Sequence, residues 1–229
     1  MTKTLSIIIP VYNEERTIGE ILSRVQSVKL TDYTKEIIVV DDGSSDNTKR
    51  ILKTWEKRVH VIYKEKNEGK GSAVTLGLRH VTGDIILIQD ADLEYSPDDY
   101  PVLLKPFDND QVNIVYGSRF LGPHLSTMFV YAQGNKFVTL VTNILFNTNI
   151  TDMETGYKVF RKKVLDGIIL RAKRFDVEPE LTVRALKKGY QIYEVPINYF
   201  GRKFSEGKKL TWIDGVVALW TIIKYRFTN

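Results

Sequence analysis

The sequence predicts an α/β fold with a mainly parallel sheet flanked by helices. Short runs rich in β-branched residues alternate with longer amphipathic runs through the first half of the 229-residue chain, an order typical of βαβ units. Hydrophobic residues make up 43% of the chain, which is enough for one substantial core. The sequence has no internal repeat and no linker rich in Gly, Pro or Ser. We therefore expect a single domain over residues 1–229.

Strands and helices are expected to alternate along the first half. The expected strands are residues 5–10, 36–42, 59–63, 84–90 and 112–118. The expected helices are residues 13–28, 44–57 and 68–81. Apolar residues at helical spacing predict the first helix, Ser and Asp caps predict the start of the second, and the third begins after glycines. Each strand therefore ends beside the start of a helix.

Two later segments, residues 135–147 and 210–227, carry apolar stripes at helical spacing. Neither is long enough to span a bilayer. In the second, the stripe consists of Ile213, Val216, Val217, Trp220, Ile223 and Phe227. Tryptophan with flanking Lys224 and Arg226 is typical of a helix that lies in a membrane interface, although core packing explains the stripe equally well. We predict an amphipathic membrane-binding helix over residues 211–227 rather than a core helix.

Composition excludes some chemistry. The chain has no cysteine, so it has no disulfide, thiol nucleophile or Cys-ligated metal. A net charge of +5 and a pI near 9.1 indicate an anionic partner, which could be nucleic acid, a nucleotide or anionic lipid. The N-terminus is unlike a signal peptide, and no export is expected. Basic residues of a later segment favour a lipid surface: Lys158, Arg161, Lys162, Lys163, Arg171, Lys173 and Arg174.

Polar motifs follow three of the predicted strands, at residues 10–15, 41–48 and 89–95. In such sheets, ligands bind outside the carboxyl ends of the strands. If the strand from residue 84 continued through Asp92, its period of two would place Asp90 and Asp92 on the same side. Two close carboxylates suit a hard cation such as Mg²⁺ or Mn²⁺. An isolated Asp-x-Asp is more often a solvated cap, but this one is accompanied by the other motifs.

The other strand-end motifs point to a nucleotide. Asp41 and Asp42 are acceptors suited to a nucleobase and ribose, while residues 43–46 can also form an ordinary turn and N-cap. Lys70 lies between glycines at a helix start, where backbone amides suit a phosphate. The chain has neither a P-loop nor a Gly-x-Gly-x-x-Gly motif after its first strand. Both P-loop phosphoryl transfer and a dinucleotide cofactor are therefore disfavoured.

The ordered motifs resemble a known family. The first half resembles inverting family 2 glycosyltransferases of the GT-A fold, through "SIIIPVYNEE", "VVDDGSSDNT", "NEGKGSA", "QDADLEY" and "YGSRF". The second half resembles the polyprenyl-phosphate (dolichyl-phosphate) sugar transferases, through "DMETGYKVFR", "FDVEPELTVRALKKGYQIYEVPI" and "GRKFSEGKKLTWIDG". Those enzymes move a hexose from a nucleotide sugar to a lipid phosphate. The resemblance covers nearly the whole chain, with residues 1–120 as the donor half and 121–229 as the acceptor half.

The resemblance implies roles for individual residues. Catalytic roles fall to Asp90, Asp92, Arg119 and Asp152, where Asp152 is either a base or a partner that orients an arginine. Donor contacts fall to Pro10, Tyr12, Glu14, Asp42 and Lys70. The metal, Mg²⁺ or Mn²⁺, would be held by Asp90, Asp92 and Glu94, although relatives often carry Gln in place of Glu94. The acceptor phosphate would be bound by Arg119, Arg202, Lys208 and Lys209.

The resulting hypothesis is transfer of a hexose from GDP-mannose or UDP-glucose to a polyprenyl or dolichyl phosphate. The enzyme would be bound peripherally at the cytoplasmic face of the membrane, with no nucleic acid partner. A phosphate acceptor is already ionised near pH 7 and needs cations rather than a base. Relatives often continue into transmembrane helices, which leaves room for a membrane-protein partner. One alternative is a soluble transferase that extends a glycan hydroxyl with Asp152 or Glu154 as base. Another is a non-catalytic nucleotide-sugar-binding module.

Overall fold

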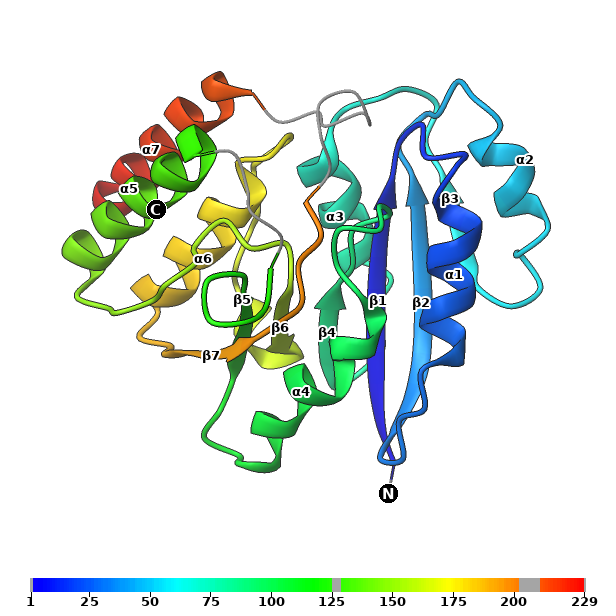
Figure 1. Cartoon of the computed structure of the whole chain (residues 1–229), viewed down its shortest axis with the longest axis horizontal. Coiled ribbons are helices and arrows are strands. Elements are labelled where there is room, and N and C mark those ends of the chain that lie inside the picture. The colour runs from blue at the N-terminus through cyan, green and yellow to red at the C-terminus, as the bar shows by residue number, and fades with distance from the viewer. Residues whose placement is uncertain (1, 125–128, 202–210, 229) are drawn as a thin grey trace.

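The computed structural model of the chain describes residues 2–124, 129–201 and 211–228. A seven-stranded sheet in the order β3-β2-β1-β4-β6-β5-β7 forms its centre (Figure 1). The strands are β1 (Lys3–Val11), β2 (Tyr33–Asp41), β3 (His60–Tyr63), β4 (Ile85–Ile88), β5 (Ile114–Ser118), β6 (Lys158–Arg161) and β7 (Ile192–Pro196). The helices are α1 (Ile18–Ser27), α2 (Thr48–Lys53), α3 (Lys70–Leu78), α4 (Tyr100–Leu104), α5 (Phe129–Phe146), α6 (Val177–Lys187) and α7 (Trp212–Phe227).

The predicted α/β class and the order of elements are confirmed, with differences at the boundaries. All five predicted strands and all predicted helices are present. The first helix begins at Ile18 instead of residue 13, after a turn in which Asn13 has a φ of 51°. The fourth strand ends at Ile88 instead of residue 90. β6, β7, α4 and α6 were not predicted. β6, α6 and β7 lie inside the segments that carry the resemblance to polyprenyl-phosphate sugar transferases.

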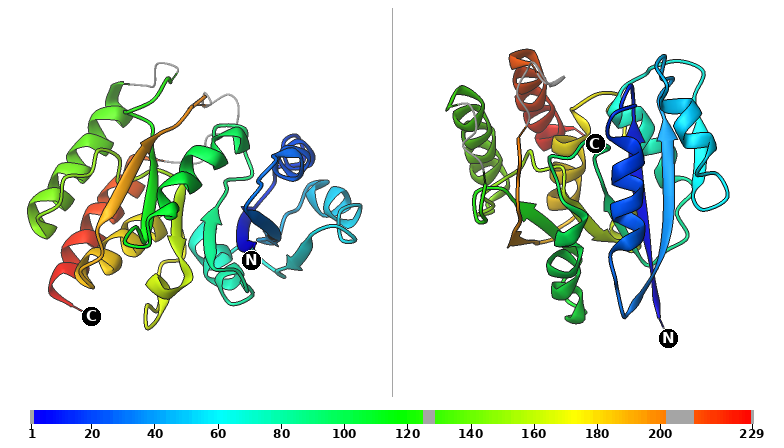
Figure 2. Two further views of the ribbon diagram at one scale, coloured as in Figure 1. Left: turned by 90° about the horizontal axis from the view of Figure 1, so that it is seen from below. Right: turned by 45° about the vertical axis from the view of Figure 1, so that its right-hand side comes forward.

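Helices cover both faces of the sheet (Figure 2). Successive side chains of β1 point to opposite faces, so Leu5 and Ile7 pack with α1 and α4, whereas Ile8 packs with α3 and α6. Both sets are fully buried. The central strands therefore read as continuous apolar runs, as expected for strands covered on both sides.

The direction of β6 decides what lies at the carboxyl edge of the sheet. β6 is antiparallel to its neighbours β4 and β5, whereas the other strand pairs are parallel. The amino end of β6 therefore lies at the edge where the parallel strands end. Residues 152–157, which precede β6, consequently lie beside the ends of β4 and β5.

α7 has two apolar faces, and the sequence pattern identified only one. The predicted stripe is the exposed face, with Trp220 64% and Phe227 76% exposed. The other face carries Ala218, Ile222 and Tyr225, which are buried in a cluster shared with α5 and α6. The expectation of a helix outside the core was therefore wrong for this face. None of the described helices is long and apolar enough to cross a membrane.

A buried carboxylate positions the loop between β6 and α6. Glu180 is fully buried and accepts hydrogen bonds from the backbone N–H groups of Arg171 (2.9 Å) and Ala172 (2.6 Å). Its second oxygen accepts a hydrogen bond from Nε of Arg184 at 2.8 Å. Glu180 therefore fixes the loop that packs against the start of α3.

Replacing Glu180 with alanine is expected to lower the free energy of unfolding by about 3 kcal/mol, because it removes a fully buried carboxylate and leaves Arg184, whose side chain is only 15% exposed, without its ion-pair partner. Urea unfolding measures the change. Glu20→Ala is the matched control, because Glu20 forms an exposed pair with Arg24, in which the side chains are 47% and 45% exposed. Such a pair contributes about 0.5 kcal/mol or less. Equal losses in the two variants would contradict the assigned role of Glu180.

Candidate active site

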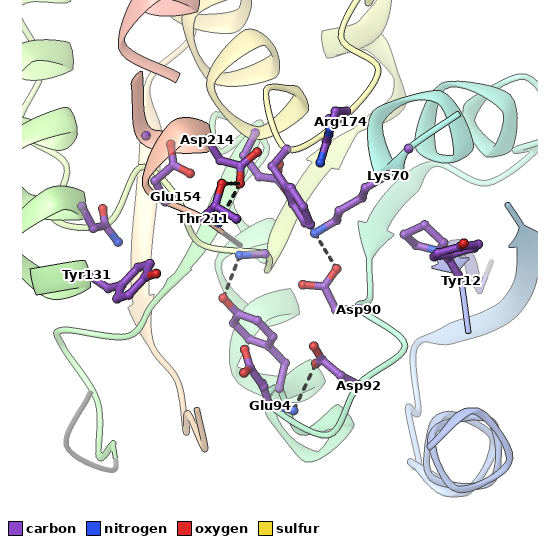
Figure 3. Close-up of a pocket in the computed structure, with 18 of the residues that line it drawn as sticks. Tyr12, Lys70, Asp90, Asp92, Glu94, Tyr131, Glu154, Arg174, Thr211 and Asp214 are labelled. Carbon is purple, nitrogen blue, oxygen red and sulfur yellow. Dashed lines mark hydrogen bonds and ion pairs between the residues drawn. The ribbon is translucent and has the colours of Figure 1, made fainter. Parts of the chain in front are cut away.

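A cavity of about 1130 Å³ lies at the carboxyl edge of the sheet (Figure 3). It brings together residues predicted separately from motifs after β1, β2, β4 and β5 and at the start of α3: Pro10, Tyr12, Glu14, Asp42, Lys70, Asp90, Asp92, Glu94 and Arg119. Asp152 lies behind Arg119 and is fully buried. Arg202, Lys208 and Lys209 lie outside the described residues.

Lys70 forms ion pairs with two carboxylates at the centre of the cavity. Its Nζ lies 2.5 Å from Oδ1 of Asp90 and 2.7 Å from Oε1 of Glu178 in the first turn of α6. Burial acts to lower the pKa of Lys70, but the charges of Asp90 and Glu178 outweigh it and raise this pKa above its ordinary value. Lys70 therefore remains an ammonium that joins three elements of the fold.

The acidic motif after β4 is arranged differently from the prediction. Because β4 ends at Ile88 and residues 91–94 form a bend, the strand period does not place Asp90 and Asp92 together. Both still line the cavity. Oδ1 of Asp92 accepts a hydrogen bond from the N–H of Glu94 at 3.1 Å, and Oε2 of Glu94 accepts one from the hydroxyl of Tyr199 at 2.8 Å.

The carboxylates suit a metal ion that takes some of its ligands from the substrate, rather than one that is coordinated by protein side chains alone. Within the described part of the chain, no group of three His, Asp or Glu side chains is clustered as a metal site. Asp92 and Asp90 nevertheless offer hard oxygen donors to the cavity. Mg²⁺-type sites commonly use one or two carboxylates together with phosphate oxygens of the substrate. The donor set therefore suits a divalent cation that arrives with a diphosphate.

Two of the backbone amides that were expected to suit a phosphate at the start of α3 are already hydrogen-bonded to protein. The N–H groups of Gly71 and Ser72 donate to the carbonyl groups of Arg174 (3.0 Å) and Lys173 (3.1 Å). These amides are therefore already bonded to protein. Asp42 also has a structural role. Its carboxylate accepts hydrogen bonds from the N–H of Gly69 at 2.7 Å and from Nζ of Lys64 at 2.5 Å.

Asp152 orients Arg119. Its two oxygens bind Nε and Nη2 of Arg119, each at 2.7 Å, and Oδ1 also accepts a hydrogen bond from Nδ2 of Asn135 at 2.8 Å. Burial acts to raise the pKa of Asp152, but the charge and hydrogen bonds of Arg119 outweigh it and lower this pKa below its ordinary value. Of the two predicted roles, the geometry favours orientation of an arginine over proton abstraction.

Residues not assigned from the sequence also line the cavity: Tyr131, Asn135, Arg174 and Glu178. Glu178 was detectable in principle, because a carboxylate inside the apolar start of a helix needs a partner. The α5 residues Tyr131 and Asn135 gave no sequence signal. Lys158, interpreted as a surface cation, is instead fully buried and donates to the carbonyl of Met153 at 2.7 Å.

Glu154 differs from the other carboxylates of the cavity. Its Oε1 is buried with no hydrogen-bond partner among the described residues, as is Oε2 of Glu178. Burial and the charge of Glu178 raise the pKa of Glu154 to about 8. Burial also lowers the pKa of Lys158 to about 8. Burial beside Glu178 therefore raises the pKa of Glu154 and favours its protonated form.

Comparisons with known proteins agree with this arrangement. Residues 6–169 match the sequence model of the family described as "Glycosyl transferase family 2". The UDP-N-acetylglucosamine–dolichyl-phosphate N-acetylglucosaminyltransferase of Methanococcus voltae is 32% identical over 225 residues, covering 89% of this chain and 88% of that protein. The dolichol-phosphate mannosyltransferase of Pyrococcus furiosus is also 32% identical, over 216 residues that cover 89% of this chain and 58% of that protein.

A solved structure shares the fold. The crystal structure of glucosyl-3-phosphoglycerate synthase from Mycobacterium tuberculosis, in complex with Mn²⁺, uridine diphosphate and glucosyl-3-phosphoglycerate, matches with a TM-score of 0.77. The two proteins are 20% identical, and the match covers 97% of this chain and 80% of that one. The predicted GT-A fold is thereby confirmed.

Asp152→Asn is expected to reduce stability at neutral pH by about 3 kcal/mol, because it breaks a buried ion pair. Since the folded-state pKa of Asp152 is lowered, its ionisation stabilises the fold fully above the unfolded pKa of about 3.9. That contribution is lost as pH falls through the folded pKa. The difference in free energy of unfolding between wild type and variant, measured from pH 7 to pH 2, should therefore narrow below about pH 4.

Asp110→Asn is the control for this measurement, because it removes an exposed ion pair. The Asp110 side chain is 95% exposed, and its Oδ1 lies 3.3 Å from Nη2 of Arg161. The free energy of unfolding of Asp110→Asn should differ little from that of the wild type at every pH. A difference for Asp152→Asn that stays constant down to pH 2 would show that ionised Asp152 does not stabilise the fold.

Proposed function

The chain belongs to glycosyl transferase family 2, and on that premise we propose that this glycosyltransferase moves a hexose from a nucleotide sugar to a polyprenyl or dolichyl phosphate. One observation carries the proposal. The same cavity contains strand-end carboxylates suited to a metal-bound diphosphate and an arginine held in place by a buried carboxylate. It therefore offers a place for a leaving diphosphate and a cation for an anionic acceptor.

The donor is assigned to the part of the cavity lined by Pro10, Tyr12 and Glu14 at the end of β1. Asp92, with Asp90, would hold a divalent metal on the diphosphate. The bound metal would neutralise the charge that develops on the leaving group. Lys70 contributes a second positive charge beside Asp90. The Mn²⁺ and uridine diphosphate bound by the mycobacterial structure of the same fold support this assignment.

The acceptor is assigned to the side of Arg119. Its guanidinium carries five N–H groups, of which two bind Asp152, so others can be donated to phosphate oxygens. A hydroxyl acceptor would instead need a base. Asp152 is paired with Arg119 and Asn135, and Glu154 has a pKa raised to about 8. These environments favour a phosphate acceptor at neutral pH, and Arg202, Lys208 and Lys209 are proposed to extend its site.

The acceptor's lipid chain suggests attachment at the cytoplasmic face of a membrane. α5 and α7 lie side by side (Figure 1, Figure 2), and both leave apolar side chains exposed, of which Val130, Phe137 and Val216 also line the cavity. On α5 these are Phe129, Val130, Phe137, Leu140 and Ile144, and on α7 they are Ile213, Val216, Val217, Trp220, Ile223 and Phe227. Exposed Lys224 and Arg226 on α7 suit an anionic lipid surface.

We propose GDP-mannose or UDP-glucose as the nucleotide-sugar donor. The name of the relative from Methanococcus voltae makes UDP-N-acetylglucosamine a third candidate donor. A transfer assay tests the function. Each radiolabelled nucleotide sugar is incubated with Mg²⁺ or Mn²⁺ and either dolichyl phosphate or dolichol. Product is expected with the phosphate only.

Asp92→Asn is expected to reduce transfer to dolichyl phosphate at least 100-fold, because loss of a charged ligand weakens metal binding at the diphosphate. Metal-dependent donor binding should fall in parallel, which calorimetry with and without Mn²⁺ measures. Asp98→Asn, at an exposed carboxylate six residues away, should retain wild-type activity. Wild-type turnover by Asp92→Asn would remove the metal assignment, and transfer to dolichol instead of its phosphate would favour a hydroxyl acceptor.

The membrane proposal predicts that Trp220→Gln/Phe227→Gln weakens binding to vesicles of phosphatidylglycerol and phosphatidylcholine at least tenfold. Each side chain contributes about 1.5–3 kcal/mol when its apolar surface is buried, and tenfold corresponds to about 1.4 kcal/mol. Co-sedimentation at low salt measures the loss. Ile169→Gln removes a side chain that is 71% exposed outside these helices and should leave binding unchanged. A wild-type chain that ignores the vesicles would contradict this assignment.

A further inference from the structure

Two buried carboxyl groups of the cavity are not explained by metal binding or by orientation of Arg119. Oε1 of Glu154 and Oε2 of Glu178 are buried and have no hydrogen-bond partner among the described residues. Both residues line the cavity. A buried polar atom without a partner is costly, so these two oxygens mark a place where a polar ligand completes the structure.

The position of these groups corresponds to the sugar. In Figure 3, Glu154 lies near Tyr131 and Asp214, across the cavity from Tyr12, with Asp90 between the two sides. If the nucleoside lies at Tyr12 and the diphosphate at Asp90, the transferred sugar extends toward Glu154. Glu178 borders the same region, because its other oxygen binds Lys70, which also binds Asp90.

The charges around Glu154 favour a neutral carboxyl group beside an ionised one. Glu178 forms an ion pair with the Lys70 ammonium at 2.7 Å. Together with burial, its negative charge raises the pKa of Glu154 to about 8. The charged and titratable groups that act on Glu154 or line the cavity beside it come from several elements: Glu178 on α6, Lys158 on β6, Arg119 after β5, Asp152 on its own loop, Tyr131 on α5 and Asp214 on α7.

We infer that the pair of Glu154 and Glu178 carries one proton and binds two hydroxyl groups of the transferred sugar, with Glu154 as donor and Glu178 as acceptor. A sugar hydroxyl both donates and accepts, so neighbouring hydroxyls satisfy one carboxylic acid and one carboxylate together. The inference rests on the proposed function and makes Glu154 a residue that positions the sugar. A second ionised carboxylate could not donate, and it would repel Glu178.

The test measures how much the sugar contributes to donor binding as pH changes. Calorimetry on the full chain with Mg²⁺ compares UDP with UDP-glucose and UDP-N-acetylglucosamine, and GDP with GDP-mannose, from pH 6.5 to pH 9.5. The dissociation constant of the free nucleotide is divided by that of the nucleotide sugar, and this ratio cancels the titration of the base that both ligands share. Any effect of the terminal phosphate, which titrates at about pH 6 in the free nucleotide only, appears equally in the Glu154→Gln variant. For the sugar that binds best at pH 7, this ratio should fall about tenfold as Glu154 ionises.

Glu154→Gln is the decisive variant, because the amide retains a donor and an acceptor but does not titrate. Its ratio should stay within about twofold of the neutral-pH value throughout. Lys158 still titrates in this variant, so a fall that persists in Glu154→Gln would assign the pH dependence to Lys158 and overturn the inference. Glu154→Leu, which cannot donate, should show the low ratio at every pH.

Infrared spectroscopy provides a readout that does not depend on binding. The wild type should show the carbonyl stretch of a protonated carboxylic acid that disappears with a midpoint near pH 8, and Glu154→Gln should lack it. Persistence of that band in Glu154→Gln would place the proton elsewhere and refute the assignment. A pH-independent ratio in the wild type would also refute it while leaving the proposed function intact. If no nucleotide sugar binds the wild type at pH 7, the proposed function fails, and this inference fails with it.

Discussion

The rest of the cavity depends on the ion pairs of the Lys70 ammonium, whose side chain is 15% exposed. Asp90 and Glu178 come from different parts of the chain, and burying two carboxylates together is unfavourable without a cation between them. Lys70 supplies that cation at 2.5 and 2.7 Å. Its backbone is fixed in turn, because Gly71 donates to the loop before α6 and Glu180 holds that loop through two backbone hydrogen bonds. A buried carboxylate outside the cavity thus determines where the central cation lies.

The reversed strand β6 connects Arg119 to this centre. Because β6 starts at the edge where its neighbours end, the segment before it reaches both Asp90 and Arg119. Gly156 allows the closest approach, since a Cβ there would collide with Oδ2 of Asp90. Its N–H donates to the hydroxyl of Tyr95 at 2.9 Å, and four residues earlier Asp152 binds Arg119. One antiparallel strand therefore sets the spacing between Lys70 and Arg119.

The sequence predicted the features that depend on neighbouring residues alone, namely the strands and the motifs at their carboxyl ends. The parallel strands carry long apolar runs because helices cover both faces, and their carboxyl-end motifs had to meet at one edge. What could not be predicted depends on contacts distant in sequence. The amides at the start of α3 were expected to be available to phosphate, but Gly71 and Ser72 are paired about a hundred residues later in the chain. The second apolar face of α7, around Ile222, exists only because α5 and α6 pack there.

Ionisable side chains are distributed through the cavity according to what each can bind. Asp90, Asp152 and Glu178 each form an ion pair with a cation and fix its position. Glu154 is the exception: its strongest charged neighbour is another carboxylate, and the buried Lys158 does not fully offset it. A fully paired site would bind a diphosphate and a phosphate through metal and arginine alone, with no group left for the uncharged sugar between them. A neutral acid beside a carboxylate supplies a donor and an acceptor without adding charge, which is the requirement for recognising hydroxyl groups.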